Sequence, residues 1–159
     1  MHLRTHLTLA LTLLLLPLQA LADPRPDELA ALEQPYTVEY NYRIKRGHEV
    51  EFMELYRRNH WPILVADMQR GEIVSVELDR ARMSSAESHR WDIRVTITFR
   101  NVLIPHGLID RTREPIIEKL YPDRERWERE EQRRFELCDA IMVVETDSID
   151  VSEWATTGQ

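Results

Sequence analysis

Residues 90 to 101 hold the most regular pattern in the chain, a strict alternation of apolar and polar side chains. One face carries Trp91, Ile93, Val95, Ile97 and Phe99, and the other carries Asp92, Arg94, Thr96, Thr98 and Arg100. A period of two that is rich in aromatic and β-branched residues predicts a half-buried strand. A slip of one residue would turn the whole apolar row to water, so this strand is expected to have a single register.

Three further strands are predicted on the same grounds. Residues 36 to 45 alternate cleanly, and residues 72 to 82 place Val74, Val76 and Leu78 on one face. Residues 140 to 149 contain a nearly continuous apolar run, which is typical of a strand buried on both faces.

Two long helical patterns lie between these strands. Residues 48 to 70 repeat apolar side chains at helical spacing. Pro62 has no backbone N–H, so it predicts a kink or two consecutive helices, with Pro62 at the first position of the second. Residues 123 to 138 predict another helix that Asp123 caps. Its expected buried stripe consists of Trp127, Phe135 and Cys138.

The order strand, helix, strand, strand, helix, strand is the βαββαβ pattern of a ferredoxin-like α+β fold. Such a fold has a four-stranded antiparallel sheet with its helices on one face. We assign this domain to residues 36–149, with an N-terminal tail at residues 23–35 and a C-terminal tail at residues 150–159.

The opposite face of the predicted sheet is polar and of mixed charge. It carries Glu39, Asn41, Arg43, Ser75, Glu77, Arg94, Thr96 and Thr98. Opposite charges can pair across neighbouring strands, so this face can simply be solvated. Alternatively, two subunits place these faces together and enclose a shared barrel, and we favour this homodimer.

Residues 1–22 have the organisation of a secretory signal peptide. Arg4 precedes an apolar run of about ten residues, and Ala20-Leu21-Ala22 supplies a small-x-small cleavage site. The run is too short to span a bilayer, which needs roughly twenty residues. We therefore expect an exported protein, periplasmic or secreted, with no membrane span in the mature chain.

Net charge and cysteine content argue against a nucleic-acid-binding protein and against a disulfide-stabilised fold. The formal net charge is −7, and removal of Arg4 makes it about −8, which disfavours nucleic acid as a partner. The many arginines alternate with acids, as in Glu130 and Arg134, so we assign them to solvated faces and ion pairs. Cys138 is the only cysteine, so no internal disulfide forms and a buried, inert thiol is expected.

Asn59-His60-Trp61-Pro62 is the strongest candidate site. A polar pair and a large aromatic meet there beside a forced backbone break. If the site is catalytic, His60 is the proton-transfer group, because imidazole titrates closest to neutral pH. The alternative is structural: Asn59 and His60 satisfy backbone groups at the helix break while Trp61 packs.

A small apolar molecule is the expected ligand, bound between the sheet and the helices. The residues expected to contact it are Tyr40, Tyr56, Asn59, Trp61 and Arg94. Packing of the same aromatic side chains into a core is the competing interpretation. His48, His89 and His106 lack the spacing of metal ligands, and no phosphate-binding loop is present, so no metal site and no cofactor are expected.

One stretch resembles a known group of proteins. A Tyr-rich first strand is followed by Arg46-Gly47-His48-Glu49-Val50-Glu51-Phe52-Met53-Glu54-Leu55-Tyr56 and by a second strand after Gly71. This order is similar to the dimeric α/β-barrel superfamily, which includes antibiotic-biosynthesis monooxygenase-like, stress-responsive and NIPSNAP-like proteins. The resemblance covers residues 36 to 149 and implies the same fold. Haem-degrading members use an Asn, a Trp and a His from separate elements, whereas here these residues are consecutive, so that activity is not carried over.

Three functional hypotheses follow from these observations. The first is an exported, dimeric domain of unassigned function that holds a small apolar ligand. The second is a cofactor-independent monooxygenase-like or isomerase-like enzyme with His60 as acid and base. The third is a haem-handling protein, which predicts a Soret band when the purified protein is mixed with haemin.

Overall fold

The computed structural model describes residues 25–83, 86–108, 113–149, 151 and 154. The expected signal peptide at residues 1–22 lies outside the described residues. The helices and strands, in chain order, are α1 (Pro26–Leu32), β1 (Tyr36–Ile44), α2 (Glu49–Leu55), the π-helical turn η1 (Tyr56–His60), α3 (Trp61–Gln69), β2 (Ile73–Arg80), the 3₁₀ turn η2 (Glu87–His89), β3 (Ile93–Phe99), α4 (Glu114–Leu120), α5 (Arg124–Glu136) and β4 (Cys138–Thr146).

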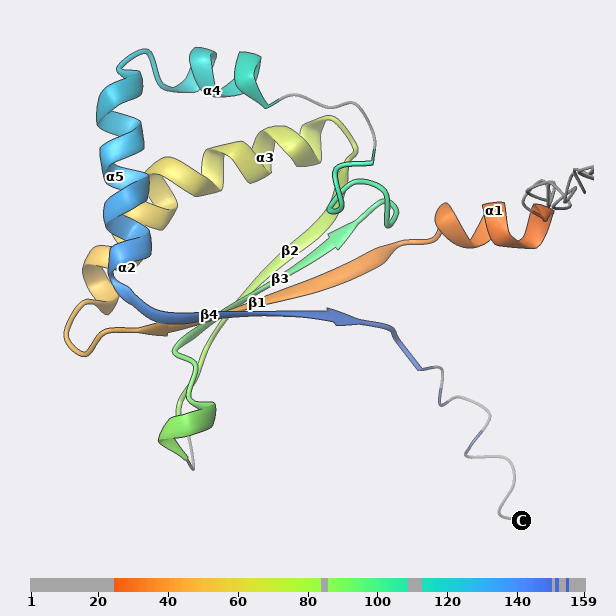
Figure 1. Ribbon diagram of the computed structural model, residues 1–159, viewed down its shortest axis with the longest axis horizontal. Helices are drawn as coiled ribbons and strands as arrows, with labels where there is room; N and C mark the ends of the chain where they lie inside the picture. Colours follow the sequence, from red (N-terminus) through yellow and green to blue (C-terminus); the bar gives the residue numbers. More distant parts are fainter. Residues whose placement is uncertain (1–24, 84–85, 109–112, 150, 152–153, 155–159) are drawn as a thin grey trace, which may run out of the picture.

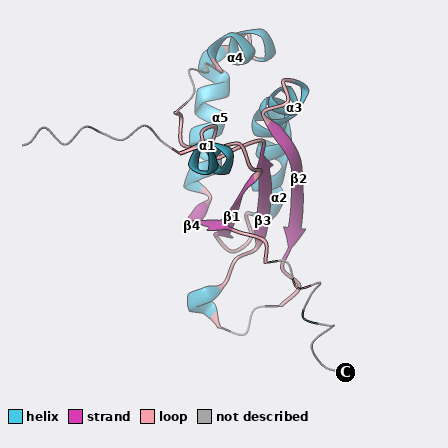
Figure 2. Cartoon of the chain, turned by 90° about the vertical axis from the view of Figure 1, so that its right-hand side faces the viewer, coloured by secondary structure: helices cyan, strands magenta, loops and turns pink. Residues whose placement is uncertain are grey.

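The four strands form one antiparallel sheet in the order β2-β3-β1-β4. Helices α2, α3 and α5 lie over one face of this sheet, and α4 lies beyond them (Figure 1). The connection that contains η2 projects away from these helices (Figures 1 and 2). The predicted ferredoxin-like α+β fold is confirmed. Among the described residues, no helix is both long and apolar enough to cross a membrane.

The core lies between the sheet and the helices. Val95, Ile97 and Phe99 of β3 are buried there against Phe52 of α2 and Leu64 of α3. Each fully buried side chain of this size stabilises the fold by roughly 1.5–3 kcal/mol before its ordering entropy is counted. The apolar row of β3 therefore fixes the face of the sheet on which the helices pack, as the alternation predicted.

The structure differs from prediction at the ends of two strands. Val74 is 61% exposed, because a register shift between Ile73 and Ser75 gives the buried place to Ile73. Trp91 precedes β3 and is not part of the core. The guanidinium of Arg94 lies 5.3 Å from the Trp91 ring centroid, so the indole serves as a cation–π partner.

β4 is an edge strand, and the prediction that it is buried on both faces is wrong. Met142, Val143 and Val144 are all exposed, because β4 pairs with β1 on one side only. Val143 lies opposite Tyr40 and Val144 opposite Glu39, so the two valines point to opposite faces of the sheet.

Some polar groups on the outer face of the sheet are paired within the chain. Arg94 donates to Asp79 at 2.8 Å and lies 3.6 Å from Glu39. The hydroxyls of Thr37 and Thr98 form a hydrogen bond across β1 and β3 at 3.1 Å. None of the described helices covers this face, which leaves Met142 and Val144 exposed beside a polar surface.

The segment predicted as an N-terminal tail contains a short helix. α1 lies beyond the end of the sheet, apart from α2 to α5 (Figure 1). The amide of Asn101 lies 3.5 Å from the carboxylate of Glu33, which follows α1 directly.

Candidate functional site

The helix that crosses the sheet contains a π turn, η1, just before Pro62. The N–H of Trp61 bonds to the carbonyl of Tyr56, five residues earlier, and Pro62 stands in the first turn of α3. The predicted division into two helices is confirmed, with a π turn as the joint. Single π turns inside α-helices occur frequently at functional sites.

The carbonyls freed by this turn receive side chains from the second half of the chain. The Tyr121 hydroxyl donates to the carbonyl of Asn59 at 2.8 Å, and the Trp127 indole N–H donates to the same oxygen at 3.2 Å. The Asn59 amide in turn donates to Glu130 at 2.8 Å. Asn59 therefore joins η1 to α5 and to Tyr121, which follows α4, by hydrogen bonds. Its side chain meets Glu130 and does not cap the broken helix as the structural alternative expected.

A cavity of about 230 Å³ lies between the sheet and the helices. Its sheet side is aromatic and apolar, and its helix side carries titratable groups. It is lined by Tyr40, Tyr42, Tyr56, His60, Leu64, Val95, Ile97, Phe99, Arg113, Arg134 and Phe135. Protein cores are normally packed without voids larger than a water molecule, so this cavity is not ordinary core packing.

Arg134 is the buried residue of α5, and the predicted stripe of that helix is wrong in two ways. Arg134 is 1% exposed, whereas Phe135 is 49% exposed. The expected pair of Glu130 with Arg134 on the wet side does not form, because Arg134 donates to Glu131 through two hydrogen bonds of 3.0 and 2.8 Å. Its guanidinium also lies 5.6 Å from the Tyr56 ring centroid and 4.4 Å from that of Phe135.

His60 shares the carboxylate of Glu131. Its Nδ1 lies 3.6 Å from Glu131 Oε2, and the His60 and Tyr56 rings are 5.1 Å apart. Burial by itself would raise the pKa of Glu131, but the interactions with His60 and Arg134 outweigh it and lower the pKa to about 2. The carboxylate is therefore ionised, and it orients both the imidazole and the guanidinium at the cavity wall.

Burial raises the pKa of both inner tyrosines. Tyr42 is raised to about 12, with the nearby charge of Arg134 opposing part of the effect. The pKa of Tyr56 is raised further by the same burial. Both hydroxyls therefore remain protonated at neutral pH and can donate hydrogen bonds.

Neither a family model nor a curated protein matches the sequence. Solved structures do match. A NIPSNAP family protein from Agrobacterium tumefaciens superposes with a TM-score of 0.51 at 16% identity, over 77% of this chain and 92% of that one. A hypothetical Arabidopsis thaliana protein superposes with a TM-score of 0.50 at 10% identity, over 77% and 95%. The chain therefore has the same fold as these two proteins. A dimeric ferredoxin-like protein from an uncultured marine organism also superposes, with a TM-score of 0.49 at 9% identity, over 76% and 96%.

At these identities the likeness to the solved structures concerns the fold alone, so the site must be judged from its own residues. Of the residues expected to bind a ligand, Tyr40, Tyr56 and His60 line the inner cavity. Asn59 lies instead on the side of the helix that meets α4 and α5. Arg94 lies on the outer face of the sheet, where Asp79 and Glu39 pair with it.

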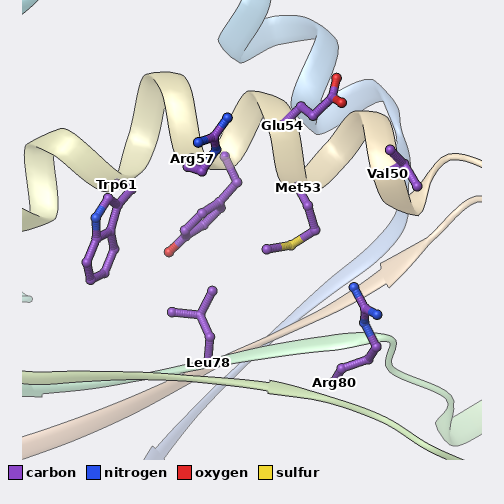
Figure 3. Close-up of a pocket in the computed structure, with 8 residues that line it drawn as sticks. Val50, Met53, Glu54, Arg57, Trp61, Leu78 and Arg80 are labelled. Atoms are coloured by element: carbon purple, nitrogen blue, oxygen red, sulfur yellow. The ribbon is translucent and has the colours of Figure 1, made fainter.

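Trp61 lines a different pocket, an open groove of about 490 Å³ between the α2–η1–α3 helix and the edge strand β2. In Figure 3, Trp61, Met53 and Val50 point from the helix toward Leu78 and Arg80 of the strand. Tyr56 lines both the groove and the inner cavity, so its side chain is part of the wall between them.

Sequence reasoning missed Glu131 and Arg134 as site residues, although a signal was present. Residues 127, 131 and 134 recur at helical spacing and share one face of α5, and Cys138, at the next such position, begins β4. Trp127 and Cys138 were assigned to that face from their apolar character, and the two charged residues between them were not. A charged pair in the middle of an otherwise apolar stripe is the pattern that could have identified them.

Proposed function

We propose that this protein is an exported, homodimeric domain that binds a small, largely apolar molecule in the cavity between its sheet and its helices. The observation that carries the proposal is the cavity itself. It holds about 230 Å³ between the apolar side chains of the sheet and the polar side chains of the helices. A small molecule that enters this volume gains apolar contact with the core and hydrogen-bonding groups at the wall.

The floor of the cavity supports an apolar ligand. Val95, Ile97 and Phe99 present only hydrocarbon from β3, and Leu64 adds a further apolar side chain from α3. Small-molecule sites commonly combine such apolar walls with a few polar groups that fix orientation. Here the polar groups are His60, Arg134 and the tyrosine hydroxyls.

A substitution that fills the cavity tests this proposal. Val95→Phe places a ring in the cavity, whereas Val74→Phe places the same ring on the exposed edge of the sheet. Amide spectra of both variants and of the wild type are recorded with toluene and with indole. We expect shifts at Tyr40, His60, Leu64 and Phe99 in the wild type and in Val74→Phe, but not in Val95→Phe. Shifts confined to the open groove, or none, would refute the proposal.

The homodimer is supported by the outer face of the sheet. Arg94 is already paired with Asp79 within one chain, and Met142 and Val144 remain exposed on the same face. Burial of this face against a second copy leaves the guanidinium of Arg94 compensated, and an uncompensated charge is the usual obstacle to burying a polar surface.

Export is supported by the sequence of residues 1–22. The test is to express the full chain and determine the first residue of the mature protein in each cell fraction. We expect a chain that begins at Asp23 outside the cytoplasm, and a full-length chain kept in the cytoplasm would count against export.

A second candidate function is an isomerase-like enzyme, and the contact between His60 and Glu131 favours it. A carboxylate that orients an imidazole is a common arrangement for a general base. In the reaction a C–H bond next to a carbonyl breaks, His60 takes the proton, and the electron pair moves to the carbonyl oxygen. The enolate then regains a proton from His60 at the same or a conjugated carbon.

Deuterium exchange separates this enzyme from a binding domain. Acetophenone is incubated with the protein in deuterated buffer, and loss of the methyl signal is followed. We expect exchange above the buffer rate that is lost in His60→Ala. A wild-type rate equal to that of His60→Ala would remove the enzymatic candidate and leave the binding function unaffected.

A further inference from the structure

We propose that the ligand of the inner cavity carries a hydrogen-bond-accepting oxygen on an otherwise apolar body, and that Arg134 and Tyr56 bind this oxygen. The inference rests on the proposed binding function and adds the chemical class of the ligand. It covers ketones and carboxylates, which share the acceptor, and it excludes plain hydrocarbons as the preferred ligand.

Two buried donors at the cavity have no acceptor among the described residues. Nη1 of Arg134 and the hydroxyl of Tyr56 are both buried and form no hydrogen bond there. Arg134 is 1% exposed and Tyr56 is 2% exposed, and both residues line the cavity. A buried polar group without a partner is costly, and native proteins keep few of them. A ligand oxygen in the cavity supplies the partner that both groups lack.

The donor groups of Arg134 and Tyr56 require that the ligand oxygen accept hydrogen bonds. Glu131 accepts from Nε and Nη2 of Arg134, so Nη1 is the guanidinium nitrogen that forms no hydrogen bond, and the Tyr42 hydroxyl lies near enough to interact with Arg134. Arg134 cannot accept a hydrogen bond, and the hydroxyl of Tyr56 remains protonated at neutral pH because burial raises its pKa. Both residues line the cavity and both groups are donors, so an acceptor is the complementary group.

The local charges allow both a neutral and an ionised acceptor. Glu131 neutralises Arg134, and Asp67 pairs with Arg113 on the far wall. The cavity thus offers directed N–H and O–H groups with little net positive charge. A ketone oxygen needs no counter-charge, and a carboxylate gains from the guanidinium, since hydrogen bonds to charged groups are the stronger ones.

The volume limits the body of the ligand. At about 230 Å³ the cavity is smaller than the roughly 300–1,000 Å³ of sites for drug-sized molecules. One aromatic ring with a short substituent is the appropriate size. The floor of Val95, Ile97 and Phe99 provides the apolar contact for such a ring.

Three probes of nearly equal shape test the inference. Acetophenone and α-methylstyrene differ in having an oxygen or a methylene at the same position, and benzoate carries an ionised acceptor there. Dissociation constants are measured for the wild type, for Tyr56→Phe and for the double variant Glu131→Gln/Arg134→Met. Tyr121→Phe is the matched control, because its hydroxyl serves a backbone carbonyl and Tyr121 does not line the cavity.

We expect the wild type and Tyr121→Phe to bind acetophenone or benzoate at least about tenfold more tightly than α-methylstyrene, since one good hydrogen bond to a charged donor is worth that factor. The tenfold preference should fall in Tyr56→Phe and fall further in the double variant, which loses the charged donor but keeps the Tyr56 hydroxyl. Affinity for α-methylstyrene should stay unchanged. Whichever of benzoate and acetophenone binds more tightly identifies the ligand as an acid or a ketone.

Three results would overturn the inference, and they are distinguishable. Equal affinity of the wild type for α-methylstyrene and acetophenone shows a site for hydrocarbons, so the proposed function stands and the oxygen acceptor does not. If no probe shifts the amide signals of cavity residues, the binding function and the inference both fail. A preference that survives in Tyr56→Phe and in the double variant removes the assignment to these two residues.

Discussion

Arg134 and Glu131 lie one turn apart on α5 and are joined by two hydrogen bonds, of 3.0 and 2.8 Å, in a place where the arginine is 1% exposed. A buried guanidinium–carboxylate pair is stable only when other groups satisfy the remaining N–H donors of the guanidinium and the remaining lone pairs of the carboxylate. Here His60 approaches Glu131, and aromatic rings surround Arg134. Nη1 of Arg134 forms no hydrogen bond, and it is the basis of the ligand class proposed above.

Removal of Arg134 alone should be strongly destabilising. Arg134→Met leaves Glu131 as a buried carboxylate without its main partner, which costs about 3–5 kcal/mol of unfolding free energy. Urea unfolding measures the loss. The double variant Glu131→Gln/Arg134→Met should recover most of it, because neither charge remains. A double variant as unstable as the single one would show that packing of the arginine, and not its charge, is what the fold needs.

Tyr56→Phe and Tyr121→Phe should change the free energy of unfolding in opposite directions. Tyr56→Phe removes a buried hydroxyl without a partner, so unfolding free energy in the absence of ligand should rise by about 1 kcal/mol. Tyr121→Phe removes a donor to the Asn59 carbonyl and should lower it by about 1 kcal/mol. Thermal and urea unfolding of the two variants give the comparison. Destabilisation by Tyr56→Phe would mean that the hydroxyl is satisfied in the free protein.

Acid should destabilise the protein through Glu131. Its folded pKa of about 2 lies below the ordinary value of 4.5, so its contribution is complete above pH 4.5 and is lost as the pH falls from 4.5 to 2. The contribution is at most about 3 kcal/mol for a shift of this size. Unfolding free energy measured from pH 7 to pH 2 should therefore fall less steeply in Glu131→Gln. Parallel curves for the variant and the wild type would contradict the lowered pKa.

Neighbouring valines on β4 should differ in their effect on assembly. Val144→Glu puts a charge on the outer face of the sheet, where a second copy is proposed to bind, and should shift light-scattering mass from dimer to monomer. Val143→Glu puts the same charge on the other face, opposite Tyr40, and should leave the dimer intact. A wild-type protein that is monomeric at high concentration would remove the dimer altogether.

The fold was predictable because it follows from local periodicity. The alternation around Val95 and the helical spacing around Phe52 each specify one buried face. The order of the helices and strands then indicates the ferredoxin-like topology. The bulge at Val74 was not predictable, because it depends on the register of β2 against β3. The exposure of Val144 depends likewise on the position of β4 at the sheet edge, which an apolar run does not indicate.

The candidate site was predicted only in part, for a related reason. The backbone break predicted at Pro62 correctly indicated the π turn η1, and His60 of that turn lines the cavity. Burial of Arg134, however, requires Glu131 on its own helix and the rings of Phe52 and Tyr56 from another. No window of sequence contains all of these residues, so a charged side chain was assigned to solvent by default.

The π turn has one more consequence, for the rotational position of α3. A helix turns by about 100° with each residue, and this turn holds one residue more than a regular α-helical turn would. The wide turn therefore takes up the extra residue, and the later side chains of α3 point as they would after a regular turn. A chain shortened by one residue between Tyr56 and His60 would close this turn to a regular α-helical one, and Asp67 would keep its place beside Arg113.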